Sequence, residues 1–177
     1  GRLTDQHSVL KARRLNAGDP RSPFQPVPIE EAVAQIRSEK PAVVFAPQVE
    51  TSAGLLLPDD YIQALAEATH EVGGLFVLDA IAAGTLWVDM LALGIDVVVS
   101  APQKGWSGSP CCAMVMLSER AIQRLSETQS NSFACDLGKW HSIMQAYENG
   151  GHAYHATMPT DALRQLRDIM QETRAYG

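Results

Sequence analysis

Short apolar runs that alternate with helix-like segments are the feature that most limits how this 177-residue chain can fold. Most neighbouring positions in each run are apolar, which is typical of strands buried on both faces. The runs predicted to be strands are residues 42–46, 75–78, 95–100 and 113–117. Strands of this kind need helices on both sides, so the sequence predicts a three-layer αβα fold with a mostly parallel sheet and right-handed crossovers.

Apolar residues three or four positions apart predict helices between and after these runs. The expected helices cover residues 29–38, 62–72, 90–93, 121–125, 136–147 and 161–174. Asp59 or Asp60 is expected to cap the second helix, which Gly73 and Gly74 then end. The proline-rich stretch 18–28 predicts an irregular surface connection, because each proline ring removes a backbone donor. The length suits one domain.

The composition is that of an ordinary globular protein, with 46% hydrophobic residues, 19% charged residues and a formal net charge of -6. The negative charge disfavours a nucleic-acid or anionic-membrane partner. No apolar stretch approaches the roughly 20 residues that span a bilayer, and the first residues do not resemble a signal peptide. We therefore expect a cytoplasmic protein with neither a nucleic-acid nor a membrane partner.

The cysteines predict neither a disulfide framework nor a metal site. Cys111 and Cys112 are adjacent and Cys135 stands apart, so the paired spacing of metal ligands is missing. Reduced thiols that pack against their neighbours are the simpler interpretation. The alternative is a nucleophile at Cys111 or Cys112, although no motif with a nearby histidine supports it.

Polar residues follow three of the predicted strands. They are Glu50, Thr51 and Ser52 after the first strand, Asp79 after the second, and Gln103 and Lys104 after the third. Because the carboxyl ends of parallel strands meet at one edge of a sheet, these residues are expected to converge there. An amine, a carboxylate and hydroxyls suit a cofactor with an aldehyde, a pyridine nitrogen and a phosphate, which pyridoxal phosphate combines.

Successive segments of the chain resemble, in order, the motifs of the class V aminotransferases. These segments are QVETSAG (48–54), LDAIA (78–82), GIDV (94–97), SAPQKG (100–105), SERA (118–121) and YHATMP (154–159). The similarity is nearest the branch of the alanine–glyoxylate and serine–glyoxylate aminotransferases. It implies a fold-type I pyridoxal-phosphate enzyme that transfers an amino group from a small amino acid to a 2-oxo acid such as glyoxylate.

By this resemblance, Lys104 forms the Schiff base with the cofactor and serves as general acid and base. Asp79 lies against the pyridine nitrogen and keeps it protonated, because a nearby negative charge favours the charged form. Thr51 matches a hydroxyl that contacts the cofactor, and Gln103 matches a glutamine at the phosphate end.

The resemblance also implies a homodimer with shared active sites, in which Tyr154 and Thr157 reach the phosphate of the neighbouring subunit. The roles of other motif residues stay open. Glu50 and Ser52 either shape the turn or take part in function, and His155 is more typical of a hydrogen-bonded structural residue. Trp106 is interpreted as a packing residue.

Family members are considerably longer than this chain. Their preceding part supplies a phosphate loop and an aromatic that stacks on the pyridine ring, and their following part forms a small domain with an arginine for the substrate carboxylate. We therefore expect residues 1–177 to be a partial pyridoxal-phosphate-binding large domain without those two regions.

The chain also departs from the family at two places. Gln48 stands where many relatives have histidine, and Pro110-Cys111-Cys112 replaces a more usual proline-glycine pair. Two other functions remain open. One is a pyridoxal-phosphate lyase or desulfurase, although these carry histidine where this chain has Gln103. The other is a truncated, inactive fragment.

Overall fold

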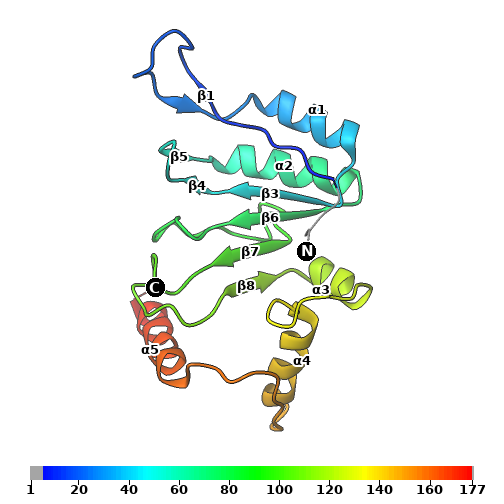
Figure 1. Ribbon diagram of the computed structural model, residues 1–177, viewed down its shortest axis with the longest axis vertical. Coiled ribbons are helices and arrows are strands. Elements are labelled where there is room, and N and C mark those ends of the chain that lie inside the picture. Colours follow the sequence, from blue (N-terminus) through cyan, green and yellow to red (C-terminus); the bar gives the residue numbers. More distant parts are fainter. Residues whose placement is uncertain (1–5, 177) are drawn as a thin grey trace.

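A four-stranded sheet lies at the centre of the computed structural model, which describes residues 6–176 (Figure 1). Its strands are β3 (Val43–Pro47), β6 (Leu75–Asp79), β7 (Val97–Ser100) and β8 (Met114–Leu117), in the spatial order β3-β6-β7-β8. The first three strands are parallel, and β8 runs antiparallel to β7. The predicted α/β architecture with a mostly parallel sheet is therefore confirmed.

The register of the sheet aligns the strand ends that matter for the site. Pro47 pairs with Asp79, and Asp79 pairs in turn with Val99. The carboxyl ends of β3, β6 and β7 therefore lie at one edge. This agrees with the expected convergence of the segments that follow these strands.

Five helices were predicted at nearly the positions where they occur. They are α1 (Ile29–Glu39), α2 (Asp59–Glu71), α3 (Glu119–Ser126), α4 (Leu137–Glu148) and α5 (Thr160–Tyr176). Among the described residues, no helix is long and apolar enough to cross a membrane.

Two details of the helix prediction were wrong. Residues 90–93 form a turn and not a helix, because Asp89 Oδ1 accepts the N–H groups of Leu91 and Ala92 and Gly94 then takes a positive φ of 68°. Neither Asp59 nor Asp60 caps α2, because its N-cap is Pro58 and both aspartates lie within the first helical turn. Their charges still oppose the positive end of the helix dipole.

The proline-rich stretch lacks long regular structure, as predicted. Its only strand is β2 (Phe24–Gln25), which pairs with β1 (Arg13–Arg14). A second short hairpin, β4 (Val49–Glu50) with β5 (Leu55–Leu56), follows β3 directly. It places residues 51–54 in a turn beyond the carboxyl edge of the sheet.

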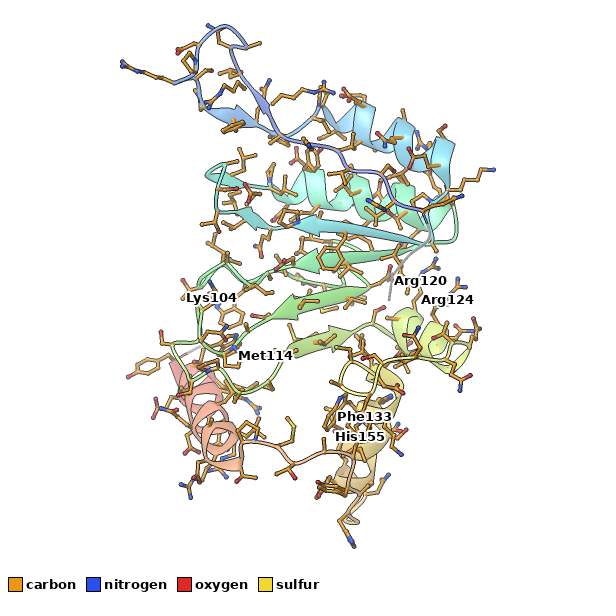
Figure 2. All side chains as sticks on the ribbon, viewed as in Figure 1. Lys104, Met114, Arg120, Arg124, Phe133 and His155 are labelled. Atoms are coloured by element: carbon orange, nitrogen blue, oxygen red, sulfur yellow. The ribbon has the colours of Figure 1, made fainter. Side chains whose placement is uncertain are left out.

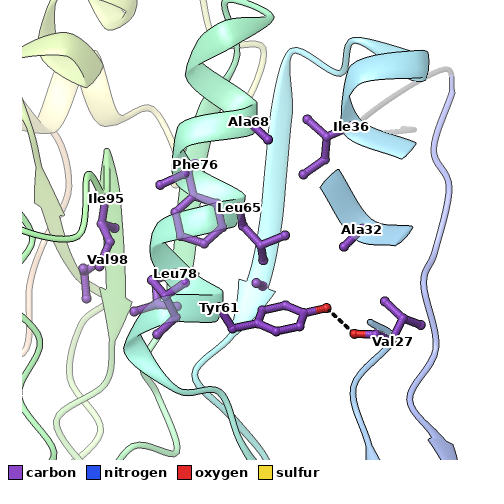
Figure 3. Packing of buried hydrophobic residues seen from close by; sticks show 13 residues of the cluster. Val27, Ala32, Ile36, Tyr61, Leu65, Ala68, Phe76, Leu78, Ile95 and Val98 are labelled. Atoms are coloured by element: carbon purple, nitrogen blue, oxygen red, sulfur yellow. Dashed lines mark hydrogen bonds between the residues drawn. The ribbon is translucent and has the colours of Figure 1, made fainter. Parts of the chain in front are cut away.

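The hydrophobic core lies between α2 and one face of the sheet, with α1 packed on α2 (Figure 3). Ile62, Phe76 and Leu78 are completely buried there, and each contributes about 1.5–3 kcal/mol of burial free energy. The hydroxyl of buried Tyr61 donates to the carbonyl of Val27 over 3.0 Å. This hydrogen bond ties the irregular N-terminal part to the core.

The periphery of the sheet is less covered. On the face opposite α2, Val43 and Phe45 of β3 are 51% and 61% exposed. Helix α4 contains no buried residue, and α5 contains only Leu166. Figure 1 shows α4 and α5 beyond β8, joined by an extended segment. The described residues thus combine a well-packed α1–α2–sheet unit with a loosely attached C-terminal part.

Candidate active site

Asp79 occupies the last position of β6, at the centre of the carboxyl edge. Its side chain is half-buried, and Oδ1 accepts the backbone N–H of Ile81 over 2.9 Å. Among the described residues, no donor binds the other oxygen, Oδ2. The carboxylate is thus oriented by its own loop and keeps one oxygen available for a ligand.

Lys104 lies in the turn that follows β7. Its carbonyl accepts the N–H of Ser107 over 3.0 Å, and Pro102 accepts the N–H of Gly108 over 2.8 Å, which closes the turn. The lysine side chain is exposed at the carboxyl edge of the sheet (Figure 2). Within residues 6–176 its amine forms no ion pair, so no carboxylate competes for it.

The other cofactor candidates on the same edge are exposed as well. Thr51 lies in the β4–β5 turn, and Gln103 directly precedes Lys104. The turn around Thr51 is shaped by Glu50, whose carboxylate accepts the hydroxyl of Ser52 at 2.8 Å and the N–H of Ala53 at 2.7 Å. The bond from Ser52 is the main reason why the pKa of Glu50 is lowered. Glu50 and Ser52 therefore have a structural role in this turn.

Tyr154 and Thr157 lie away from this edge. The Tyr154 hydroxyl is 2.7 Å from Thr157 Oγ1, in the segment between α4 and α5, and Tyr154 is 74% exposed. His155, which lies between them, is hydrogen-bonded through Nε2 to the carbonyl of Phe133 at 2.9 Å. Figure 2 shows His155 beside α4, well apart from Lys104 at the carboxyl edge of the sheet. The chain does not bring Tyr154 and Thr157 to its own Lys104.

Within residues 6–176, Gln48 has a buried side-chain oxygen without a hydrogen-bond partner; the sequence showed this residue only as a departure from the family. Its backbone N–H donates to the carbonyl of Asp79 over 2.8 Å, and its own carbonyl accepts the N–H of Leu57 over 2.8 Å. The side chain is 4% exposed, and the buried Oε1 has no hydrogen-bond partner. An unpaired buried oxygen costs about 1–3 kcal/mol. The only sequence signal was a polar residue directly after an apolar strand.

Asp96 was also missed, although it is the third residue of the GIDV motif (94–97) at the start of the third strand. Its buried carboxylate lies at the amino end of β7, where Oδ2 is 2.8 Å from both the N–H of Phe76 and Nε2 of His70. Ser118 and Arg120 approach Oδ1 at 3.3 and 3.7 Å. This network joins α2, β6 and α3 at the edge opposite Lys104, so it stabilises the sheet without facing the candidate site.

The structure disfavours Cys112 as a nucleophile. The sulfurs of Cys111 and Cys112 are 3.8 Å apart, and burial raises the pKa of Cys112 to about 11. A raised pKa leaves little nucleophilic thiolate at neutral pH. No cluster of three or more potential metal ligands occurs within the described part of the chain.

The residues at the carboxyl edge fit pyridoxal phosphate by their chemistry. A free amine can bind the aldehyde, an oriented carboxylate can pair with the ring nitrogen, and hydroxyl and amide groups can contact the remaining polar atoms. In Lys104, Asp79, Thr51 and Gln103 this edge offers all of these groups.

Comparisons with known proteins agree with this fit. No family model matches the chain. Alanine–glyoxylate aminotransferase of Felis catus is 31% identical over 157 residues, which are 86% of this chain and 36% of that protein. The 2-aminoethylphosphonate–pyruvate transaminase of Paraburkholderia phymatum is 32% identical over 149 residues, covering 82% and 38%. The chain thus spans slightly more than a third of the length of these relatives.

Solved structures show the same fold. The ureidoglycine–glyoxylate aminotransferase of Bacillus subtilis superposes with a TM-score of 0.62 at 27% identity, covering 81% of this chain and 37% of that one. The alanine–glyoxylate aminotransferase of Nostoc sp. gives a TM-score of 0.69 at 24% identity, with 85% and 39% covered. The sequence and fold similarities agree: over more than four fifths of its length the chain is similar to class V aminotransferases of fold type I.

Proposed function

We propose that the protein containing this segment is a pyridoxal-phosphate-dependent aminotransferase that transfers an amino group from a small amino acid to a 2-oxo acid such as glyoxylate. One observation carries the proposal. Asp79 ends β6 and Lys104 lies in the turn after the adjacent parallel strand β7, so both are at the same edge, and both keep polar atoms free for a ligand. Glyoxylate is named as the acceptor because it appears in the names of the feline and Bacillus relatives.

Lys104 is the residue that attaches the cofactor in this proposal. When bound, pyridoxal phosphate supplies an electrophilic aldehyde and an electron-withdrawing ring. The Lys104 amine, once free, would serve as the general base that accepts a proton from the substrate α-carbon and as the general acid that delivers it to the former aldehyde carbon of the cofactor. Lys104 is exposed and has no carboxylate partner in the described part of the chain, so its amine is free to bind the cofactor and to act as base and acid.

Asp79 has the complementary electrostatic task. Its negative charge favours the protonated form of a pyridine nitrogen beside it, because an opposite charge stabilises a cation. The bond from Ile81 holds the carboxylate in place, so little reorganisation is needed when a ring binds. Thr51 and Gln103 are assigned to contacts with the remaining polar groups of the cofactor.

We also propose a homodimer in which Tyr154 and Thr157 complete the site of the other subunit. Two findings support it: the mutual hydrogen bond of these residues orients their hydroxyls, and His155, which lies between them in the sequence, is well apart from Lys104 in Figure 2. Phe133, Met144 and Tyr147, on or beside α4, are all more than half exposed, as expected for a surface that another subunit covers. Residues 1–177 accordingly form part of a larger cofactor-binding domain.

Reconstitution with pyridoxal phosphate tests the proposal. We expect the visible absorbance band of lysine-bound cofactor in the wild type, no band in Lys104→Ala, and an unchanged band in the control Lys11→Ala, whose side chain is exposed in an irregular segment. A band that survives Lys104→Ala contradicts the assignment.

Product analysis then separates the reactions. With alanine and glyoxylate as substrates, an aminotransferase forms pyruvate and glycine. Release of sulfide from cysteine would instead indicate a desulfurase, which no specific contact in the structure favours. Bound cofactor without turnover would identify an inactive fragment.

A further inference from the structure

We propose that a contact between the loop after β6 and the loop after β7 positions Lys104 relative to Asp79. We call this contact the glycine seam; it consists of Gly84 against Gly105, reinforced by Trp87 against Trp106. Its catalytic meaning rests on the proposed function, whereas the contact itself is a property of the fold. The seam makes Gly105 a positioning residue.

The backbone atoms of the two glycines are too close for any side chain at position 105. A Cβ built on Gly105 would lie 2.1 Å from the carbonyl oxygen of Gly84, 2.6 Å from its carbonyl carbon and 2.9 Å from its Cα. All three atoms belong to the backbone, so no rotamer change can relieve the clash. Real protein structures avoid such distances, and therefore one of the two loops has to move when position 105 carries a side chain.

Position 84 favours glycine for a different reason, which is its backbone conformation. Its φ of +65° lies in the left-handed region, where a side chain is strained, but a Cβ there would meet no atom within 4 Å. The two glycines therefore separate two effects. Substitution at 105 changes the spacing of the loops, whereas substitution at 84 strains the backbone and leaves the space between the loops free.

An aromatic contact joins the same two loops. The rings of Trp87 and Trp106 lie 5.0 Å apart with an interplanar angle of 73°, the edge-to-face arrangement that aromatic pairs favour. Trp87 is 67% exposed, so its ring is held mainly by the contact with Trp106. Two independent contacts thus fix one loop against the other.

The position of the seam links it to the candidate site. Asp79 and Val99 are paired in the sheet, and the chain leaves both strands from that point. The loops meet again at Gly84 and Gly105, the latter directly after Lys104. The backbone of Lys104 is therefore fixed on one side by the sheet and on the other by the seam. Widening the seam therefore changes the position of Lys104 relative to Asp79.

The variants Gly105→Ala and Trp87→Ala test this inference, with Gly18→Ala as the matched control. A Cβ at Gly18 approaches only Asn16 Oδ1, at an ordinary 3.7 Å, and φ there is not in the left-handed region. In the cofactor-free Gly105→Ala and Gly18→Ala variants, which keep both Trp87 and Trp106, tryptophan fluorescence reports the state of the seam. Urea unfolding shows that each variant is folded.

Pyridoxal-phosphate affinity and the pH midpoint of the visible cofactor band report the geometry of Lys104. We expect Gly105→Ala to weaken cofactor affinity at least tenfold and to shift this midpoint, with Trp87→Ala giving a smaller change and Gly18→Ala none. A midpoint shift distinguishes positioning from a general loss of stability.

A wild-type affinity and midpoint in Gly105→Ala would overturn the inference, as would equal changes in Gly18→Ala. If Gly105→Ala does not fold, Trp87→Ala decides, and a wild-type midpoint in that variant overturns the proposal. Failure of the proposed function gives a different result: the wild type itself then shows no cofactor band. The altered fluorescence of Gly105→Ala would persist in that case.

Discussion

The hydrogen-bond network around the buried carboxylate of Asp96 provides the strictest test of the structure. Its Oδ2 accepts the N–H of completely buried Phe76 and lies 2.8 Å from His70 Nε2, while Arg120 approaches Oδ1. Arg120 also donates to the carbonyl of Gly74 over 3.0 Å. Figure 2 shows Arg120 on α3, at the end of the sheet away from Lys104. Replacing Asp96 by alanine removes a shared acceptor from three elements at once.

The expected loss follows from the individual contacts. The N–H of Phe76 becomes a buried donor without a partner, which costs about 1–3 kcal/mol, and the bond to His70 contributes about 1 kcal/mol. Breaking a buried charged network typically costs about 3–5 kcal/mol in total. We therefore expect Asp96→Ala to lower the free energy of unfolding by about 3 kcal/mol. Asp96→Asn keeps an amide oxygen in the same place and should lose about 1 kcal/mol.

Urea unfolding followed by circular dichroism measures this loss. With a slope of about 1–3 kcal/mol per molar urea, Asp96→Ala should lower the midpoint by roughly 1–3 M. The matched control is Asp161→Ala, whose carboxylate is 98% exposed and 3.7 Å from Arg164, and which should lose less than about 1 kcal/mol. If Asp96→Ala unfolds at the same urea concentration as Asp161→Ala, the network does not stabilise the sheet as described.

Three further changes have definite expected outcomes. Tyr61→Phe leaves the Val27 carbonyl without its donor and should cost about 1 kcal/mol in urea unfolding; an unchanged midpoint would contradict that bond. At pH 8 the raised pKa of Cys112 leaves little thiolate, so iodoacetamide should modify Cys112 at least roughly tenfold more slowly than exposed Cys135; mass spectrometry of the digested chain measures both rates, and equal rates would contradict the burial. Gln48→Met removes the unpaired oxygen at similar volume and should raise the free energy of unfolding of the cofactor-free chain by about 1 kcal/mol, whereas a loss of stability would show that the amide has a partner.

The strands and long helices could be predicted because they depend on local pattern. The run at 75–78 differs from β6 by one residue, and the spacing of Ile62 and Leu65 matches the buried face of α2. Prediction failed where a single side chain overrode the pattern. Asp89 closes a turn at residues 90–93, and Pro58 takes the capping position because its fixed φ suits the residue before a helix.

The candidate site could be predicted in part for a similar reason. Asp79 and Lys104 were found because the carboxyl ends of parallel strands meet at one edge, a rule that needs only the order of the strands. The glycine seam and the orphaned oxygen of Gln48 depend on contacts through space between loops. No periodicity or spacing in the sequence reports such contacts.

Chemical trapping of the cofactor tests the central claim most directly. The chain should be loaded with pyridoxal phosphate, reduced with borohydride and digested, and the modified lysine identified by mass spectrometry. The account predicts that the reduced cofactor is found on Lys104, the one lysine in a turn that follows a strand at the carboxyl edge of the sheet. Label on Lys11, Lys40 or Lys139 with Lys104 unmodified would contradict it.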